Sequence, residues 1–122
     1  MSKTLLAKAL ANTIDTDASY CFISDLAAQL DNISPRLSKS IITAIERAEG
    51  VRLNYALIDK VTYNSLHNIL SFIFDIDNPL SDQAFNQLVV EVPREALKNV
   101  KLPQIKNALT AQIFDGAYQF KN

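Results

Sequence analysis

The sequence predicts an all-α fold, a compact single-domain bundle of about six to eight short helices around a central helix near residues 63–76. The chain has two glycines in 122 residues, which disfavours folds rich in hairpins and bulges, because these need positive-φ positions. Drawn as a helix, residues 63–76 place apolar side chains over an arc of about 200°. We therefore expect Leu66, Ile69, Leu70 and Ile73 to be buried, and Asn64, Asn68 and Ser71 to be the most exposed side chains of this helix.

Helix boundaries in the first half follow from capping residues. Ser2 is a candidate N-cap, Thr16 or Asp17 is the next, and Ser34 caps a helix that begins at Pro35, where proline sacrifices no hydrogen bond. Gly50 supplies the C-terminal stop of that last helix. The expected helices span residues 2–12, 16–30 and 35–48.

The second half contains two segments whose pattern fits a helix or a strand. Residues 51–61 alternate like a strand, although a helix from Asn54 is preferred, and residues 87–92 have the β-branched content of a strand within an expected helix from Asp82. A small α+β fold with strands near 51–57 and 87–92 is therefore the alternative. Prolines predict helices over 93–100 and 103–115, the latter with an inner line of Ile105, Leu109 and Ile113 and a stop at Gly116.

Residues 1–122 are expected to form one helical domain, with 117–122 as a mobile C-terminal tail. Phe114 points away from the inner line of the last helix, so it either packs beneath this tail, which is the preferred interpretation, or faces a partner. The aromatic residues Phe114, Tyr118 and Phe120 are therefore candidate partner-binding residues.

The composition predicts a soluble cytoplasmic protein. The N-terminus has no apolar run of signal-peptide length, and no segment approaches the roughly 20 apolar residues that span a bilayer. One cysteine forms no internal disulfide, which suits a reducing compartment.

No residue pattern predicts catalysis, a cofactor or a metal. His67, Ser71 and Asp75 are the residue types of a hydrolase triad, but a mid-helix serine lacks free amide donors for an oxyanion. The only histidine and the only cysteine, Cys21, lack the paired ligands of a zinc site. Acidic stretches near Asp15 and Asp75 lack the glycine and closing glutamate of a calcium loop.

Charge is distributed in blocks along this slightly acidic chain, whose net charge is -1. Residues 9–35 and 62–93 each carry four acids and no base, whereas 36–60 and 94–122 are net basic. Such blocks are typical of solvated faces, and they also fit docking surfaces. The acidic candidates for partner binding are Asp15, Asp17, Asp75, Asp77 and Asp82.

The leading hypothesis is a non-enzymatic protein–protein interaction module. A small inhibitor, adaptor or immunity-type protein, encoded by a phage or mobile element and acting by occlusion of a partner, fits a small acidic chain without catalytic motifs. The alternative is a helical nucleic-acid-binding regulator that uses basic residues in 36–60 or 94–106. Its candidate residues are Arg94, Lys98, Lys101 and Lys106. The partner's identity and the oligomeric state, including self-association, stay open.

Overall fold

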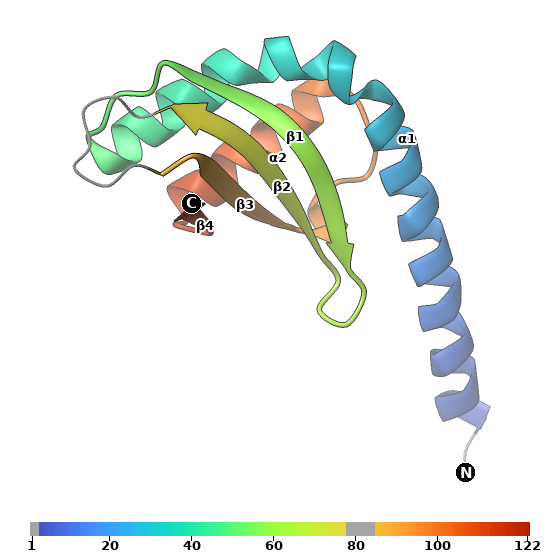
Figure 1. Cartoon of the computed structure of the whole chain (residues 1–122). Coiled ribbons are helices and arrows are strands. Elements are labelled where there is room, and N and C mark those ends of the chain that lie inside the picture. Colours follow the sequence, from blue (N-terminus) through green and yellow to red (C-terminus); the bar gives the residue numbers. More distant parts are fainter. Residues whose placement is uncertain (1–2, 78–84) are drawn as a thin grey trace.

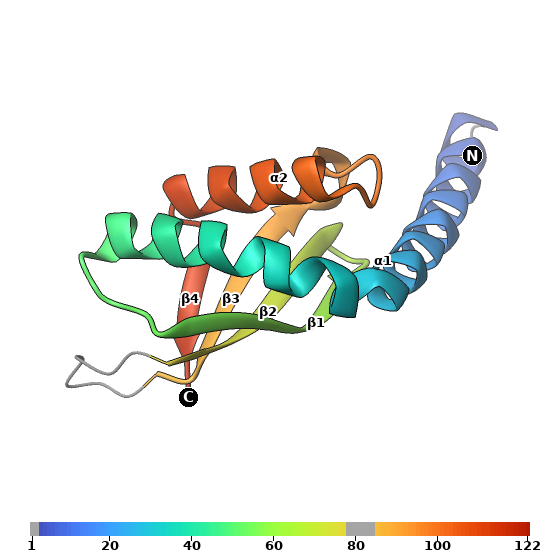
Figure 2. The same cartoon turned by 90° about the horizontal axis from the view of Figure 1, so that it is seen from above.

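The protein has an α+β fold, so the predicted helical bundle is wrong. The structure, a computed structural model, describes residues 3–77 and 85–122, with side chains from Tyr20 onward. Within these ranges two α-helices cover one face of a four-stranded antiparallel sheet (Figures 1 and 2). The elements are α1 (Lys3–Glu49), β1 (Tyr55–Asn64), β2 (Ile69–Asp77), β3 (Gln87–Pro93), a 3₁₀ turn (Arg94–Ala96), α2 (Leu102–Phe114) and β4 (Tyr118–Lys121).

The sheet has its strands in sequence order, β1-β2-β3-β4. The predicted central helix is instead the end of β1, a turn and most of β2. Its apolar residues satisfy a period of two as well as a helical arc, and the alternation places Leu70, Phe72 and Phe74 on the covered face with none of their surface exposed. The two neighbouring strands supply hydrogen bonds along both edges of β2, which decides in favour of the strand.

The turn between β1 and β2 explains why the burial predictions for this segment were partly wrong. Leu66, which was expected in the core, lies at the turn and is 85% exposed. The side chain of Asn64 accepts hydrogen bonds from the amides of Leu66 and His67, and Asn68 has a φ of 55°. Asparagine tolerates this left-handed conformation, so a polar turn replaces a helix here. Leu70 is buried and Asn64 and Asn68 are exposed, as predicted, whereas Ile69, Ile73 and Ser71 are half-buried.

Helix α1 is one helix of 47 residues rather than three. Pro35 lies inside it, and the ribbon changes direction in its middle, as expected where proline removes an amide and crowds the preceding turn (Figure 1). Ser34 does not cap a helix; its hydroxyl accepts a hydrogen bond from the amide of Ile58, at 3.1 Å, in the edge strand β1. The predicted stop at Gly50 is confirmed, with a φ of 66° just after the last helical residue.

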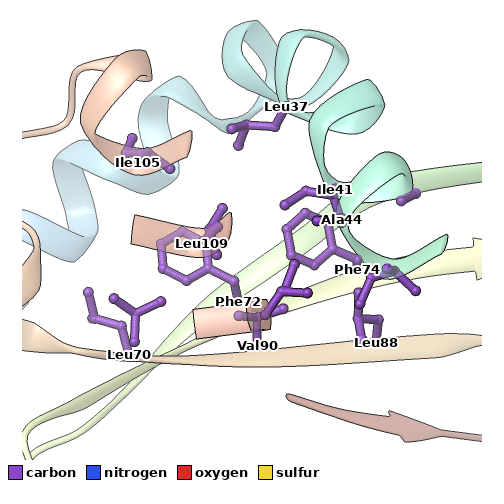
Figure 3. Packing of buried hydrophobic residues seen from close by; sticks show 14 of the residues in the cluster. Leu37, Ile41, Ala44, Leu70, Phe72, Phe74, Leu88, Val90, Ile105 and Leu109 are labelled. Carbon is purple, nitrogen blue, oxygen red and sulfur yellow. The ribbon is translucent and has the colours of Figure 1, made fainter. Parts of the chain in front are cut away.

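The hydrophobic core lies between the two helices and the sheet, where side chains of α1, α2, β2 and β3 interdigitate (Figure 3). The predicted inner line of α2, Ile105, Leu109 and Ile113, is confirmed as buried. On α1 the buried positions follow helical spacing, and β2 and β3 contribute alternate residues. The largest fully buried side chains include Phe72, Phe74, Leu37, Ile41, Leu88 and Leu109.

The remaining helix predictions also need correction. The expected helix from Asn54 is strand β1, the expected helix from Asp82 contains strand β3 in its described part, and only a short 3₁₀ turn follows Pro93. Strands near 51–57 and 87–92 belonged to the α+β alternative, which is the fold class found. Residues 118–121, expected in a tail, form β4, and Val90 and Leu88 of β3 pair with Tyr118 and Phe120.

Candidate functional site

Of the five predicted acidic residues, only Asp75 and Asp77 have described side chains, and they lie two residues apart on the open face of β2. Asp75 is exposed on the open face of β2, while Asp77 at the end of that strand accepts a 2.7 Å hydrogen bond from the side chain of Asn54. Asp82 lies outside the described residues. Asp15 and Asp17 belong to the part of α1 for which only the backbone is described. An acidic docking surface therefore stays a prediction.

The aromatic candidates separate into two groups. Tyr118 and Phe120 are half-buried and make contacts within the protein, where Phe120 stacks on Phe85 with ring centroids 5.3 Å apart. Phe114, in contrast, is 75% exposed at the end of α2. The preferred interpretation that Phe114 packs beneath the C-terminal residues is wrong, because three quarters of its surface is exposed to solvent.

Tyr118 donates a hydrogen bond to the carboxylate of Glu49, which joins β4 to the end of α1. Burial raises the pKa of Tyr118 to about 12 from 10.0, and the hydrogen bond and the negative charge of Glu49 add to the effect. The folded chain thus holds this proton more tightly than the unfolded chain does. The resulting stabilisation is complete below pH 10 and is lost as the pH rises towards about 12.

We expect the difference in free energy of unfolding between the native protein and Tyr118→Phe to be constant below pH 10 and to shrink between pH 10 and about 12. Urea unfolding at a series of pH values measures this difference. Glu49→Gln, which keeps a hydrogen-bond acceptor but removes the charge, should narrow the pH range over which this difference shrinks. A difference that stays constant through this range contradicts the assignment of the Tyr118 proton.

The basic candidates lie on different parts of the surface. Arg94 is half-buried, with its guanidinium 4.2 Å above the ring of Phe22 and a 2.6 Å hydrogen bond to the carbonyl of Leu97, so it serves the interior. Lys98, Lys101 and Lys106 are exposed. Gln104 accepts hydrogen bonds from the amides of Lys98 and Asn99, which fixes the loop that leads to Lys101 and α2.

Two hollows lie along the seam between α1 and α2. The C-terminal half of α1 and α2 run side by side with their C-terminal ends at the same end of the molecule (Figure 2). The first, the Phe114 hollow, has a volume of 310 Å³, and the second, the Arg36 hollow, has a volume of 690 Å³. The Phe114 hollow is lined by Lys39, Ser40, Thr43, Ala44, Arg47, Thr110 and Phe114, and the Arg36 hollow by Gln29, Asn32, Ile33, Arg36, Val100, Lys101, Leu102 and Pro103.

The charged residues that line both hollows are basic. Lys39 and Arg47 border the Phe114 hollow, and Arg36 and Lys101 border the other. None of the described lining residues is acidic, and the only charged residue of α2 is Lys106, on its exposed surface. The fold thus brings Arg36 and Lys101, which come from two separate basic blocks of the sequence, to the border of one hollow.

The lining surface of the Phe114 hollow is mostly apolar, although Lys39 and Arg47 are among the residues that line it. Ala44, which is 8% exposed, lines the hollow from α1, and Phe114 lines it from α2. Thr43 and Thr110 do not leave their hydroxyls free, since each donates a 2.9 Å hydrogen bond to the carbonyl four residues earlier in its helix. An apolar depression between two cations suits an apolar side chain with negative charges beside it.

The residues that prompted a catalytic interpretation do not meet. His67 lies in the β1–β2 turn, and Ser71 and Asp75 lie four residues apart on β2, about 13 Å at the rise of a strand. Cys21 is an exposed free thiol on α1. Within the described part of the chain, no cluster of three or more histidine, cysteine or acidic side chains is suited to a metal ion.

Sequence reasoning missed the α1 side of the Phe114 hollow. The sequence places Lys39, Thr43 and Arg47 on the polar face of the helix expected after Pro35, without a role in protein binding, and their spacing of four residues puts them in one line on α1. These three residues line a hollow only because the fold places Phe114 of α2 beside them. The signal for this site in the sequence was Phe114, which lies one turn beyond Thr110 and off the inner line of α2.

The described helices contain no stretch with the length and apolar character needed to cross a membrane. Comparison of the chain with protein-family models, curated proteins and solved structures finds no match, so the geometry of the seam is the basis for interpreting its function.

Proposed function

We propose that the protein is a non-enzymatic protein–protein interaction module, such as a small inhibitor, adaptor or immunity-type protein. It binds a partner at the Phe114 hollow and thereby occludes that partner. The observation that carries this proposal is the 75% exposure of Phe114 beside an apolar depression. Burying a phenylalanine side chain contributes about 1.5–3 kcal/mol, which an exposed position forgoes until a partner covers it. Aromatic side chains in pockets are typical anchors of protein interfaces.

The arrangement of the site supports a rigid docking surface. Both walls are helices anchored in the core, on α1 by Ile41 and Ile45 and on α2 by Leu109 and Ile113. A surface held by buried residues changes little on binding, so the protein loses less conformational entropy when a partner binds. We therefore expect the isolated protein to present the hollow in its binding geometry.

The proposal is tested with the purified protein and its Phe114→Ala variant as baits in an extract of the native host, followed by mass spectrometry. The native bait is expected to retain a stoichiometric protein partner, and Phe114→Ala is expected to lose at least tenfold in affinity for it, since interface anchors typically contribute more than about 1.4 kcal/mol.

Tyr55→Ala provides a matched control, because Tyr55 is an exposed aromatic residue on the first strand, away from the seam. It should retain the partner as the native protein does. Absence of any stoichiometric partner, or equal retention by the Phe114→Ala bait, contradicts the proposed function.

Nucleic-acid binding is the second candidate, favoured by the approach of Arg36 and Lys101 at the Arg36 hollow. Its signature is association with DNA or RNA that weakens steeply with salt and is abolished by Lys101→Glu. The net charge of -1 provides little long-range attraction for a polyanion. A salt-sensitive gel shift with this mutational response would replace the proposed function by this one.

A further inference from the structure

We propose that the partner presents an acidic amphipathic helix to the seam, with one apolar side chain in the Phe114 hollow and carboxylates at Lys39 and Arg47. This inference rests on the proposed function and specifies the chemistry of the partner. It follows from three features of the hollow: its apolar walls, its two flanking cations and their separation along α1.

The spacing of the cations defines the ligand. Lys39 and Arg47 are eight residues apart on one helix, so their Cα atoms are about 12 Å apart at a rise of 1.5 Å per residue. Thr43 lies midway between them along α1 and lines the same hollow. A helix lying along the seam matches this spacing when two acidic residues are two turns apart and a large apolar residue lies one turn from each.

The charge of the seam selects against other ligands. Lysine and arginine at the rim favour carboxylates, and a basic helix would meet like charges at both ends of the hollow. Arg36 and Lys101 continue the positive surface beyond Lys39, so a longer acidic helix gains further favourable contacts there. Lys106 adds positive charge on the exposed surface of α2.

An amphipathic helix is favoured over nucleic acid by the character of the hollow. A phosphate backbone is bound by successive cations and hydrogen-bond donors, whereas the walls between Lys39 and Arg47 are mostly apolar. The hydroxyls of Thr43 and Thr110 already donate hydrogen bonds to backbone carbonyls of their own helices. Phe114 is the one aromatic side chain among the described lining residues, which makes no stacking platform for successive bases.

The test uses three labelled synthetic peptides in a fluorescence-anisotropy titration of the whole protein. The first is helical, with two glutamates two turns apart and a leucine midway; the second has lysines in place of the glutamates; the third has alanine in place of the leucine. We expect the first peptide to bind, the third to bind about tenfold more weakly, and the second to show no binding.

Charge reversal on the protein provides the decisive comparison. Lys39→Glu combined with Arg47→Glu is expected to lower the affinity for the acidic peptide by at least about tenfold. The same double variant is expected to bind the lysine peptide. Both residues are exposed, so the double variant should keep the circular-dichroism spectrum and unfolding midpoint of the native protein within a small margin. Lys60→Glu, an exposed cation on β1, is the matched control and should leave both titrations unchanged.

Each outcome decides between the inference and its rivals. Failure of the acidic peptide to bind, or equal binding of the lysine peptide, overturns the inference, as does tighter binding of a single-stranded oligonucleotide that the double variant abolishes. Self-association of the protein that is lost in the double variant assigns the seam to a second copy and also overturns it. If the extract yields a partner that needs Phe114 but not Lys39 and Arg47, the proposed function stands and the acidic helix is wrong.

Discussion

Phe72→Ala is expected to lower the free energy of unfolding by about 3–5 kcal/mol, the usual cost of removing a fully buried phenylalanine from a core. Phe72 lies in the middle of β2, pairs with Val61 on one side and Val90 on the other, and has none of its surface exposed. The truncation leaves a cavity beneath both helices, which a close-packed core fills only in part. A loss of this size is a large fraction of the stability of a small domain.

Urea unfolding monitored by circular dichroism measures this loss, and Phe114→Ala serves as the matched control. The chemical change is the same, but Phe114 is 75% exposed, so its removal should change the free energy of unfolding by no more than about 0.5 kcal/mol. Similar losses for the two variants would mean that the assignment of Phe72 to the core, or of Phe114 to the surface, is incorrect. An unchanged free energy of unfolding for Phe114→Ala would also mean that its loss of partner binding does not come from a loss of folding.

Val90→Asp is expected to prevent stable folding at neutral pH, whereas Val89→Asp is expected to be tolerated. Val90 is fully buried between Phe72 and Tyr118 across the sheet, and an unpaired carboxylate there loses its hydration without compensation. Val89 faces the open side of the sheet, half-buried beside Ile73 and Gln119, where a carboxylate keeps access to water. Consecutive residues of a strand thus differ by several kcal/mol in the cost of the same substitution.

Expression level, circular dichroism and urea unfolding of the two aspartate variants test the register of β3. Val89→Asp should retain a cooperative transition, with a loss of about 1–2 kcal/mol from its half-buried contacts. Equal destabilisation, or greater damage from Val89→Asp, would place the wrong face of β3 against the helices. The pair also separates the strand from a helix, because in a helix these residues would be only about 100° apart.

The sequence alone determined the last helix and its stops. Proline at the start, glycine at the end and the i, i+4, i+8 line of Ile105, Leu109 and Ile113 agree with one another, and the structure has α2 at Leu102–Phe114. Gly50 marked the end of α1 for the same local reason, since glycine adopts a positive φ without steric cost. Local signals suffice where capping, periodicity and backbone preference agree.

Residues 63–76 show why the rest of the fold was not accessible from local pattern. Apolar residues at consecutive and alternate positions satisfy a wide helical arc and a strand equally, and the scarcity of glycine favoured the helix. The long helix α1 shows the converse error, because Pro35 and its serine are a standard helix start that tertiary packing overrides. Buried contacts on both sides of Pro35, at Ile33 and Leu37, stabilise the continuous helix.

The candidate site depended on tertiary structure almost entirely. Its cations were visible in the sequence as basic blocks, and Phe114 stood out as a phenylalanine off the inner line of α2. The sequence determined, through local capping and periodicity, where α2 and the end of α1 lie. Only the tertiary structure decided that residues 69–77 form a strand and that Lys39, Arg47 and Phe114 surround one hollow, because strand pairing and helix packing join segments far apart in the chain.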